Sequence, residues 1–283
     1  RVAQMAAKLV LEPIFEADFV EHSYGFRPRR SAQQALEVVR VAGNQSMVHV
    51  VDADIRSFFD SIDQELLIEL VKERVSDRRV LKLIRGWLAA GVMENWQVRE
   101  TIAGTPQGGV ISPLLANIYL HAFERAWEAE GKHLGLLVRY ADDAVIHCKS
   151  EAQAHLVLRK LKARLRECGL ELHPGKTRIV DCQDINRQGT YPTIQFTFLA
   201  YTFRPRKAVD KYGRVYVNFS PGVSREALTA MRQTVRGWHL QLMVDKELRD
   251  LSNMFGSVLR GWSNYYGRFH PSALKPLWRH VND

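Results

Sequence analysis

Two apolar runs separated only by adjacent acidic residues constrain the fold of this chain more than any other stretch. In VRYADDAVIH, residues 138–147, Asp142 and Asp143 stand between segments that pattern as buried strands. The spacing predicts an antiparallel hairpin with the two aspartates at its tip. An ordinary turn is the simple alternative, because aspartate tolerates turn geometry. Adjacent like charges are nevertheless costly unless a cation lies beside them.

A second acidic strand end lies upstream. The β-branched stretch SMVHVVDADI, residues 46–55, predicts a buried strand that ends near Asp54. If this strand and the hairpin are neighbours in one sheet, three carboxylates converge at its edge. Divalent cations relieve such repulsion: Mg²⁺ accepts one or two carboxylates together with substrate phosphates. Two ions about 3.5–4 Å apart suit in-line displacement at phosphorus.

The remaining pattern predicts mixed α and β structure. Strand signals continue to about residue 221, with a two-strand insertion turning at Tyr212 and Gly213. From Ser224 onward they stop and two long helical patterns follow, so we place a domain boundary near residue 221. The other helices are expected over 2–20, 31–42 with a Ser31–Gln34 capping box, 63–75, 77–90 led by Ser76, 112–131 with Ser112 as cap before Pro113, and 151–168.

Charge is unevenly distributed along the chain. Residues 1–150 carry 18 Lys and Arg against 20 Asp and Glu, whereas residues 151–283 carry 22 against 11. A basic half interleaved with aromatic residues is typical of proteins that bind a phosphate backbone, although a solvated basic face would give the same count. An apolar run of about 18 residues is absent from the sequence, so no membrane partner is expected.

Cysteine and histidine spacing gives no sign of a zinc site or a disulfide framework. The three cysteines are far apart, which favours a reducing, cytoplasmic setting. The histidines at 22, 49, 133 and 173 do not form a spaced metal-binding set.

Six blocks in consecutive order carry a specific resemblance. They are SYGFRPRRSAQQAL, DADIRSFFDSID, GTPQGGVISPLLANIYL, RYADDAVI, GLELHPGKTRI and FLAYTF, and LRGWSNYYGRF follows them. Together they resemble the group II intron reverse transcriptase and maturase family. The resemblance implies an α+β right-hand polymerase: partial fingers and a palm with an antiparallel sheet and packed helices over residues 1–221, then an α-helical thumb or maturase region over 222–283.

The resemblance also implies roles for the acidic strand ends. Asp54 and Asp142 would bridge two Mg²⁺ ions, for which Mn²⁺ can substitute, and Asp143 would be a third, supporting ligand. The backbone carbonyl of Ile55 would complete the metal site. Asp52 precedes the matching aspartate by two positions, and we interpret it as structural.

Further residues would bind the nucleotide. A bulky ring at Phe59, or at Phe58 if the backbone bulges, would clash with a 2′-hydroxyl and select deoxynucleotides; two core phenylalanines are the simpler alternative. Gln107 and Gly108 would contact nucleotide and template. Lys176 would neutralise or protonate the departing pyrophosphate as a general acid, unless it is an ordinary surface lysine.

The last part of the chain would hold nucleic acid. Leu199, Ala200 and Tyr201 resemble the primer grip, although the family usually has glycine where Ala200 stands. Arg232, Arg236, Arg260 and Arg268 are candidates for phosphate contacts. We interpret the aromatic residues Trp238, Trp262, Tyr265 and Tyr266 as packing residues rather than base-stacking partners.

The implied function is RNA-directed DNA polymerisation on an RNA template, with a DNA or RNA primer, dNTPs and intron RNA as partners. The alternatives are a domesticated relative in CRISPR spacer acquisition, phage defence or DNA repair, and a maturase in which polymerisation is secondary. The chain lacks an initiating Met, so we expect a fragment. The resemblance implies a bacterial or organellar origin. Fingertip motifs would precede Arg1, and without them this chain would polymerise poorly. A Cys/His-rich endonuclease module is not expected.

Overall fold

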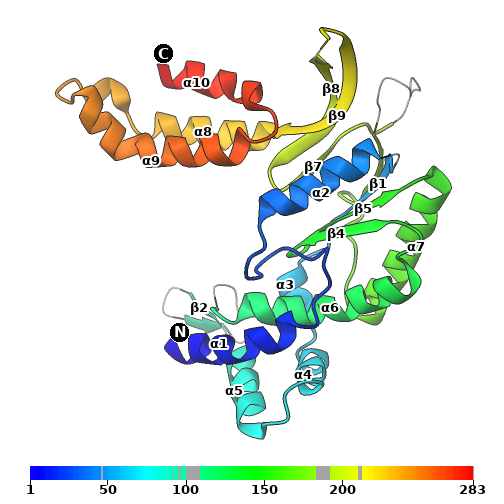
Figure 1. Ribbon diagram of the computed structural model, residues 1–283. Helices are drawn as coiled ribbons and strands as arrows, with labels where there is room; N and C mark the ends of the chain where they lie inside the picture. Colours follow the sequence, from blue (N-terminus) through cyan, green and yellow to red (C-terminus); the bar gives the residue numbers. More distant parts are fainter. Residues whose placement is uncertain are drawn as a thin grey trace. The chain divides into compact units, whose positions relative to one another are not determined.

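The computed structural model describes residues 1–45, 47–90, 92–94, 97–99, 109–182, 192–209 and 212–282. The chain forms two compact units, Arg1–Ile179 and Val180–Asp283. The first contains a mixed arrangement of helices around an antiparallel sheet. The second combines a smaller antiparallel sheet with helices (Figure 1).

The sheet of the first unit has the strand order β4-β5-β1-β6. Both pairings that involve β5 are antiparallel, and Val51 lies opposite Ile146 in the pairing of β1 with β5. The predicted strand and the predicted hairpin are therefore neighbours. The bounds are β1 (His49–Ala53), β4 (Leu136–Tyr140), β5 (Asp143–Cys148) and β6 (Arg178–Asp181), with a separate pair of short strands β2 (Val92–Glu94) and β3 (Gln97–Arg99).

Helices cover both faces of this sheet. α2 lies against β4 and β5 on one face, and α7 lies against β1 and β5 on the other. Alternate strand residues serve the two faces: Val51, Ala144 and Ile146 join the main apolar core, as expected from the two-residue period of a strand. The helices are α1 (Val2–Glu16), α2 (Ala32–Asn44), α3 (Phe58–Ser61), α4 (Gln64–Lys72), α5 (Arg78–Ala89), α6 (Ser112–Glu130) and α7 (Glu151–Glu167).

α6 lies in the centre of the main core. Leu115, Ile118 and Tyr119 are almost completely buried, and α1 and α4 pack against this helix. Burial extends to polar side chains on the same helix, since Asn117 and Glu124 are each 1% exposed. A helix that is buried on nearly all sides is closely packed, so it provides a rigid support for the elements that pack against it.

The capping residues agree with the sequence at some helices and not at others. The capping box of Ser31 and Gln34 is confirmed. The prediction that Ser76 leads α5 is wrong, because the side chain of Asp77 accepts the hydrogen bond from the backbone N–H of Arg79. The prediction that Ser112 caps α6 is also wrong: the cap position is Ile111, and Ser112 lies within the first turn.

α1 ends four residues before the predicted limit. Beyond Glu16 the guanidinium of Arg27 takes the backbone carbonyls of Phe19 and Val20 as acceptors, with Nη1 2.5 Å from the carbonyl oxygen of Val20. The backbone N–H groups of Asp18 and Phe19 both donate to the carbonyl of Phe15, so the chain leaves the helix in a tight turn. Arg27 then holds the segment after this turn, a contact that the helical periodicity does not encode.

The second unit is built on a three-stranded sheet with the order β7-β8-β9. Gly213, in the connection between β8 and β9, has φ +81°, a left-handed conformation that suits glycine. Val223, Met231 and Leu277 bring the end of the sheet and the helices into one small core. The bounds are β7 (Phe196–Phe198), β8 (Tyr201–Val209), β9 (Val215–Val223), α8 (Arg225–Arg236), α9 (Leu248–Tyr266) and α10 (Lys275–Asn282), with short 3-10 helices at Leu240–Leu242 and Pro271–Leu274.

Within the described ranges, none of the helices is both long enough and apolar enough to cross a membrane.

Acid should destabilise the first unit through a buried histidine. His147 on β5 is 0% exposed, and burial lowers the pKa of its imidazole to about 4. The unfolded chain binds this proton below about pH 6.5, so folding stability falls as the pH drops from about 6.5 to about 4. We expect His147→Leu to remove about 2 kcal/mol of the stability lost between pH 7.5 and pH 5, as measured by urea denaturation.

The matched control for this prediction is His155→Gln, because His155 is an exposed histidine on α7. This variant should keep the pH dependence of the parent protein. An unchanged pH dependence in His147→Leu would contradict the prediction.

Candidate metal and nucleotide site

The end of β1 carries Asp54, one residue beyond the last strand position. Its backbone N–H donates to Oγ1 of Thr177 at 3.3 Å, and its carbonyl accepts from the backbone N–H of His173 at 2.8 Å. Ile55 forms an isolated antiparallel bridge with Leu172. The loop after α7 therefore fixes the strand end from which the Asp54 side chain projects.

The hairpin brings the second acidic pair to the same edge. Ala53 lies opposite Ala144 in the β1·β5 ladder, so the next positions outward are Asp54 and Asp143. In the β4·β5 pairing Tyr140 lies opposite Asp143, which leaves Ala141 and Asp142 as the turn. The structure thus places the predicted aspartates of β1 and of the hairpin side by side.

A hollow of about 440 Å³ opens at this edge. Asp54 and Asp142 both line it, together with Lys176, whose Nζ lies 3.4 Å from Oδ2 of Asp54. Oxygen ligands and a lysine in one solvent-accessible hollow suit a phosphate-bearing substrate with a hard cation. The other lining residues are Ile55, Arg56, Ser57, Phe58, Phe59, Asp60 and His173.

Burial, and after it repulsion between the carboxylates, raises the pKa values of two carboxyl groups at this edge. Partial loss of hydration, followed by the charges of Asp142, Asp54 and Asp52, raises the pKa of the Asp143 carboxyl to about 6. Burial raises the pKa of Asp52 to about 6 as well, although Arg178, with Nε 3.1 Å from Oδ2 of Asp52, opposes that shift. An added cation would lower both values and relieve the repulsion.

The oxygen donors at this edge suit a divalent ion whose remaining ligands are supplied by solvent or substrate. In the parts of the chain that are described, no three His, Cys, Asp or Glu side chains group closely enough to hold an ion alone. Mg²⁺ does not need such a cage, because it binds through one or two carboxylates plus waters and phosphates. The carbonyl of Ile55 accepts none of the hydrogen bonds that tie residues 54–56 to the neighbouring loop.

The two phenylalanines that follow β1, Phe58 and Phe59, differ in exposure. Phe58 is 2% exposed and belongs to the main core, whereas Phe59 is only partly buried and packs against that core. Both rings touch the hollow, and they meet edge to face. Phe59 is therefore the ring with an accessible surface. Gln107 and Gly108 lie outside the described residues.

In the second unit, the β7–β8 turn contains two residues in the left-handed region. Leu199 has φ +50° and Ala200 has φ +61°, the geometry of a type I′ turn. The hydroxyl of Tyr265 donates to the carbonyl of Leu199 at 3.0 Å, and the hydroxyl of Tyr201 donates to the carbonyl of Tyr265. α9 thereby holds this turn, which carries all three predicted primer-grip residues.

The aromatic residues of the helical part pack against one another, as predicted. Trp238 stacks on Trp262 at a centroid distance of 5.9 Å, and Tyr265 and Tyr266 contact the ring of Tyr201. The phosphate-contact candidates are accessible by comparison. Arg236, Arg260 and Arg268 are exposed and Arg232 is half-buried.

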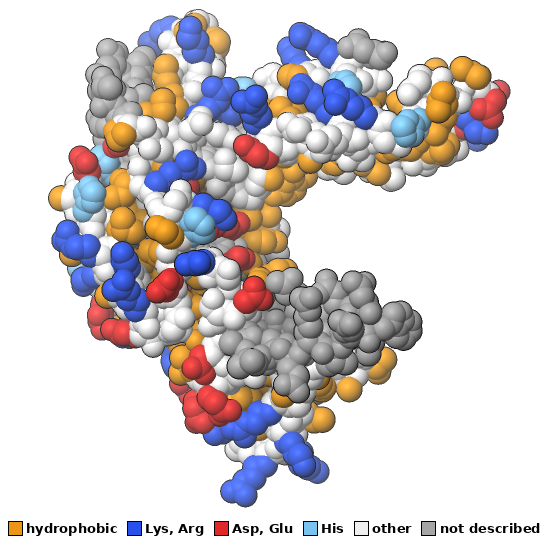
Figure 2. All heavy atoms as spheres, turned by 180° about the vertical axis from the view of Figure 1, so that it is seen from behind, with side chains coloured by type: hydrophobic (Ala, Val, Ile, Leu, Met, Phe, Trp, Pro, Cys, Tyr) orange, Lys and Arg blue, Asp and Glu red, His pale blue; other side chains and the backbone are white. Residues whose placement is uncertain are grey.

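Lys and Arg side chains are prominent on the arm formed by α8, α9 and α10 in Figure 2. In this arrangement three of the four candidate arginines are exposed, whereas the aromatic rings are half-buried against one another. Such a surface suits phosphate contacts that do not depend on base sequence.

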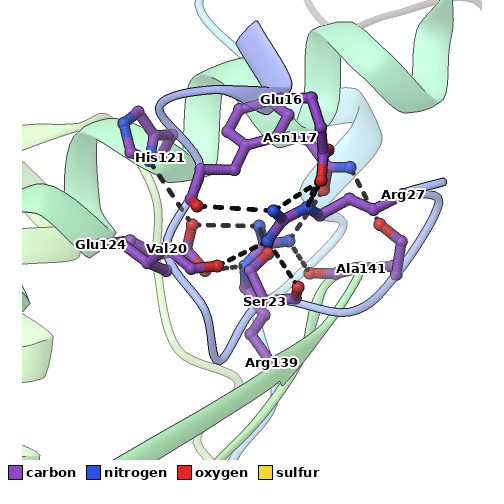
Figure 3. Close-up of polar contacts among 11 residues, drawn as sticks. Glu16, Val20, Ser23, Arg27, Asn117, His121, Glu124, Arg139 and Ala141 are labelled. Carbon is purple, nitrogen blue, oxygen red and sulfur yellow. Dashed lines mark hydrogen bonds and ion pairs between the residues drawn. The ribbon is translucent and has the colours of Figure 1, made fainter. Parts of the chain in front are cut away.

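The sequence reasoning missed four residues that support the hairpin. Arg139, Glu124 and Asn117 come together beside Ala141 of the hairpin turn (Figure 3), and Asn117 also donates to the carbonyl of Gly25. One signal could have revealed them: Arg139 is a charged residue inside a strand that is otherwise apolar.

Comparison with known protein families shows to which family this chain belongs. A model described as reverse transcriptase (RNA-dependent DNA polymerase) matches residues 1–203, well over half of the chain. The chain belongs to the reverse transcriptase family. A second model, the group II intron maturase-specific domain, matches residues 228–283 of this reverse transcriptase family member.

Curated relatives support the same assignment. The group II intron-encoded protein LtrA of Lactococcus lactis subsp. cremoris is 44% identical over 350 aligned residues, which cover 94% of this chain and 56% of LtrA. The protein YkfC of Escherichia coli is 40% identical over 129 residues, covering 44% of this chain and 34% of YkfC. This reverse transcriptase family member thus spans about half the length of LtrA.

Solved structures show the same fold at low sequence identity. An apo telomerase from Candida tropicalis has a TM-score of 0.55 at 13% identity, and covers 71% of this chain and 39% of its own. A Candida albicans telomerase in complex with a fragment of telomeric RNA has a TM-score of 0.53 at 13% identity, with 99% and 50% coverage. The reverse transcriptase family member therefore shares a mixed helix-and-sheet fold with telomerase.

The left-handed conformation of Ala200 should cost stability. We expect Ala200→Gly to stabilise the second unit by about 1 kcal/mol, because glycine adopts positive φ without steric penalty. Urea denaturation, monitored by amide hydrogen exchange in the second unit, measures this change in stability. The control Ala230→Gly places glycine at an exposed position inside α8 and should destabilise the unit by about 1 kcal/mol. Equal destabilisation by both variants would contradict the prediction.

Proposed function

We propose that this chain is the catalytic part of a group II intron-type reverse transcriptase that extends a primer on an RNA template. Residues 1–221 would form the palm with partial fingers, and residues 222–283 the helical thumb. The observation that carries the proposal is the β1·β5 register, which aligns Asp54 with Asp143 at the edge of a hollow that Asp142 also lines. Reverse transcriptases generally use divalent metals, and membership of that family supports the same chemistry here.

In this proposal Asp54, Asp142 and the carbonyl of Ile55 hold two Mg²⁺ ions, and Asp143 supports them. The ions, when bound, stabilise the attacking and leaving oxygens of the displacement at phosphorus. Lys176 contributes from the protein side. Its ammonium group, 3.4 Å from Asp54, is placed to neutralise the departing pyrophosphate or to donate a proton to it.

Phe59 would set the preference for deoxynucleotides. Its ring is accessible in the hollow, whereas Phe58 is committed to the core. A ring beneath the sugar of the incoming nucleotide leaves no room for a 2′-hydroxyl. Gln107 and Gly108 are proposed to contact nucleotide and template on the basis of the family resemblance alone.

The second unit would bind nucleic acid through contacts to its sugar–phosphate backbone. The Leu199–Ala200 turn with Tyr201 would form the primer grip, and the arginines of the helical arm would contact phosphates. Such contacts fix the position of a duplex without reading its sequence.

A second candidate function is stabilisation of folded intron RNA. The match of residues 228–283 to a maturase-specific domain favours it. Under this proposal, charge reversal at the arginines of the helical arm would abolish support for splicing, whereas a variant of Asp142 would still support it.

Primer extension on an RNA template tests the main proposal. Full-length protein carrying Asp142→Asn should lose at least about 1,000-fold in extension rate with Mg²⁺ and dNTPs, because one ligand of the metal site is removed. Binding of the primer–template should stay within about threefold of the parent protein. The control Asp60→Asn changes a carboxylate that lines the same hollow but is not a proposed metal ligand. Retained synthesis by Asp142→Asn would refute the proposal.

Selectivity for the sugar tests the role of Phe59. Phe59→Val should raise the ratio of kcat/KM for ribonucleotides to that for deoxynucleotides by about 10-fold or more, because the steric block is removed. Phe59→Tyr keeps the ring and should keep the selectivity. A Phe59→Val enzyme with unchanged selectivity would show that another side chain excludes the 2′-hydroxyl.

A further inference from the structure

A buried ion pair lies directly behind the acidic hairpin. Arg139 on β4 and Glu124 on α6 are each 1% exposed, and Nε of Arg139 donates to Oε1 of Glu124 at 2.6 Å. Burial, the largest single effect, would raise the pKa of the Glu124 carboxyl, but the charge and hydrogen bonds of Arg139 together with the nearby His121 outweigh it, and the pKa is lowered. The pair is therefore charged within the core of the protein.

All five N–H donors of Arg139 are used. Nη1 donates to Oδ1 of Asn117 at 3.1 Å and to the carbonyl of Ala141 at 2.7 Å. Nη2 donates to Oγ of Ser23 at 2.5 Å and to Oε2 of Glu124 at 3.2 Å. A guanidinium presents these donors in a fixed planar fork, which a lysine cannot reproduce. Figure 3 shows the resulting convergence of α6, the loop after α1 and the hairpin on one side chain.

The bond to Ala141 reaches the proposed catalytic site. Ala141 directly precedes Asp142 and has φ +55°, a conformation that costs an alanine about 1–2 kcal/mol. Such a conformation persists only where surrounding contacts hold it. The guanidinium of Arg139 supplies one of these contacts through the Ala141 carbonyl.

The segment before α2 closes the other side of the turn. The backbone N–H of Tyr24 donates to the carbonyl of Arg139 at 2.9 Å, and Nδ2 of Asn117 donates to the carbonyl of Gly25 at 2.9 Å. A Cβ atom added to Gly25 would lie 2.2 Å from the backbone nitrogen of Ala141. Only glycine permits this close approach, so the turn is enclosed between Gly25 and the fork of Arg139.

Stability alone does not account for this network. A buried ion pair often contributes less to folding than apolar residues of similar volume would, because both charges lose their hydration. What the network does provide is a defined position for one backbone carbonyl next to Asp142. A fully satisfied polar network restricts a core to one arrangement.

We propose that Arg139 is a positioning residue that holds Ala141 in its left-handed conformation and thereby places the Asp142 and Asp143 carboxylates for metal binding, with Asn117 and Gly25 completing the clamp. This inference rests on the proposed polymerase function. It assigns the SYGF segment, residues 23–26, and the buried polar side of α6 to the alignment of the catalytic turn.

The test compares Arg139→Lys with Arg125→Lys in the full-length protein. Arg125 lies on α6 beside Glu124 and also forms a two-point ion pair, but its partner is Glu73 at the surface. Arg139→Lys should lower kcat for primer extension by about 10- to 100-fold and raise the Mg²⁺ concentration needed for half-maximal rate, while primer–template affinity stays within about threefold. Arg125→Lys should leave kcat within about threefold and the Mg²⁺ requirement unchanged.

The outcomes separate the inference from the function on which it rests. Inactive parent protein would refute the polymerase function itself. Active parent protein with an unchanged kcat and Mg²⁺ requirement in Arg139→Lys would overturn the positioning role, as would equal kcat losses in both lysine variants.

A second variant covers the case in which Arg139→Lys does not fold. Asn117→Ala leaves the ion pair in place but removes the bridge between Arg139 and Gly25. It should lower kcat by about 10-fold with the same change in Mg²⁺ requirement. A folded Asn117→Ala enzyme with the parent kcat would overturn the proposal.

Discussion

The antiparallel ladder between β1 and β5 sets both the packing of the central sheet and the position of its acidic edge. Because Ala53 lies opposite Ala144, the residue after β1 and the first residue of β5 occupy adjacent positions at one sheet edge. A shift of the register by one residue would turn every side chain of a strand to the opposite face. The same register directs Val51 and Ile146 into the core, so apolar burial and the convergence of the aspartates are fixed by one pairing.

Repulsion between the converging carboxylates opposes folding, and each of several neighbouring residues offsets part of this unfavourable free energy. Arg178 pairs with Asp52, and Lys176 lies beside Asp54. Arg139 acts on the backbone instead, through the carbonyl that precedes Asp142. The loop after α7 and the central helix α6 thus provide rigid supports for the two sides of the site, while Asp54 and Asp142 line an open hollow.

The sequence predicted the parts of the site that depend on local pattern. The hairpin, the strand before Asp54 and the capping box at Ser31 follow from periodicity and turn chemistry, and the structure contains all three. It did not predict the early end of α1, because the hydrogen bonds of Arg27 that fix the following turn are not part of a helical pattern. The clamp of Arg139 and Gly25 escaped prediction because its members are far apart in the chain and meet only in the folded protein.

Anomalous diffraction from Mn²⁺ would locate the ions that Asp54 and Asp142 are proposed to bind. Crystals of the full-length protein with an RNA template, a DNA primer and a non-hydrolysable dNTP would be soaked in Mn²⁺. We expect two anomalous peaks about 3.5–4 Å apart, both within ligand distance of Asp54 and Asp142 oxygens. Crystals of Asp52→Asn should give the same two peaks, since Asp52 is not a proposed ligand. Anomalous peaks elsewhere in the complex, with none between Asp54 and Asp142, would contradict a two-metal site at this sheet edge.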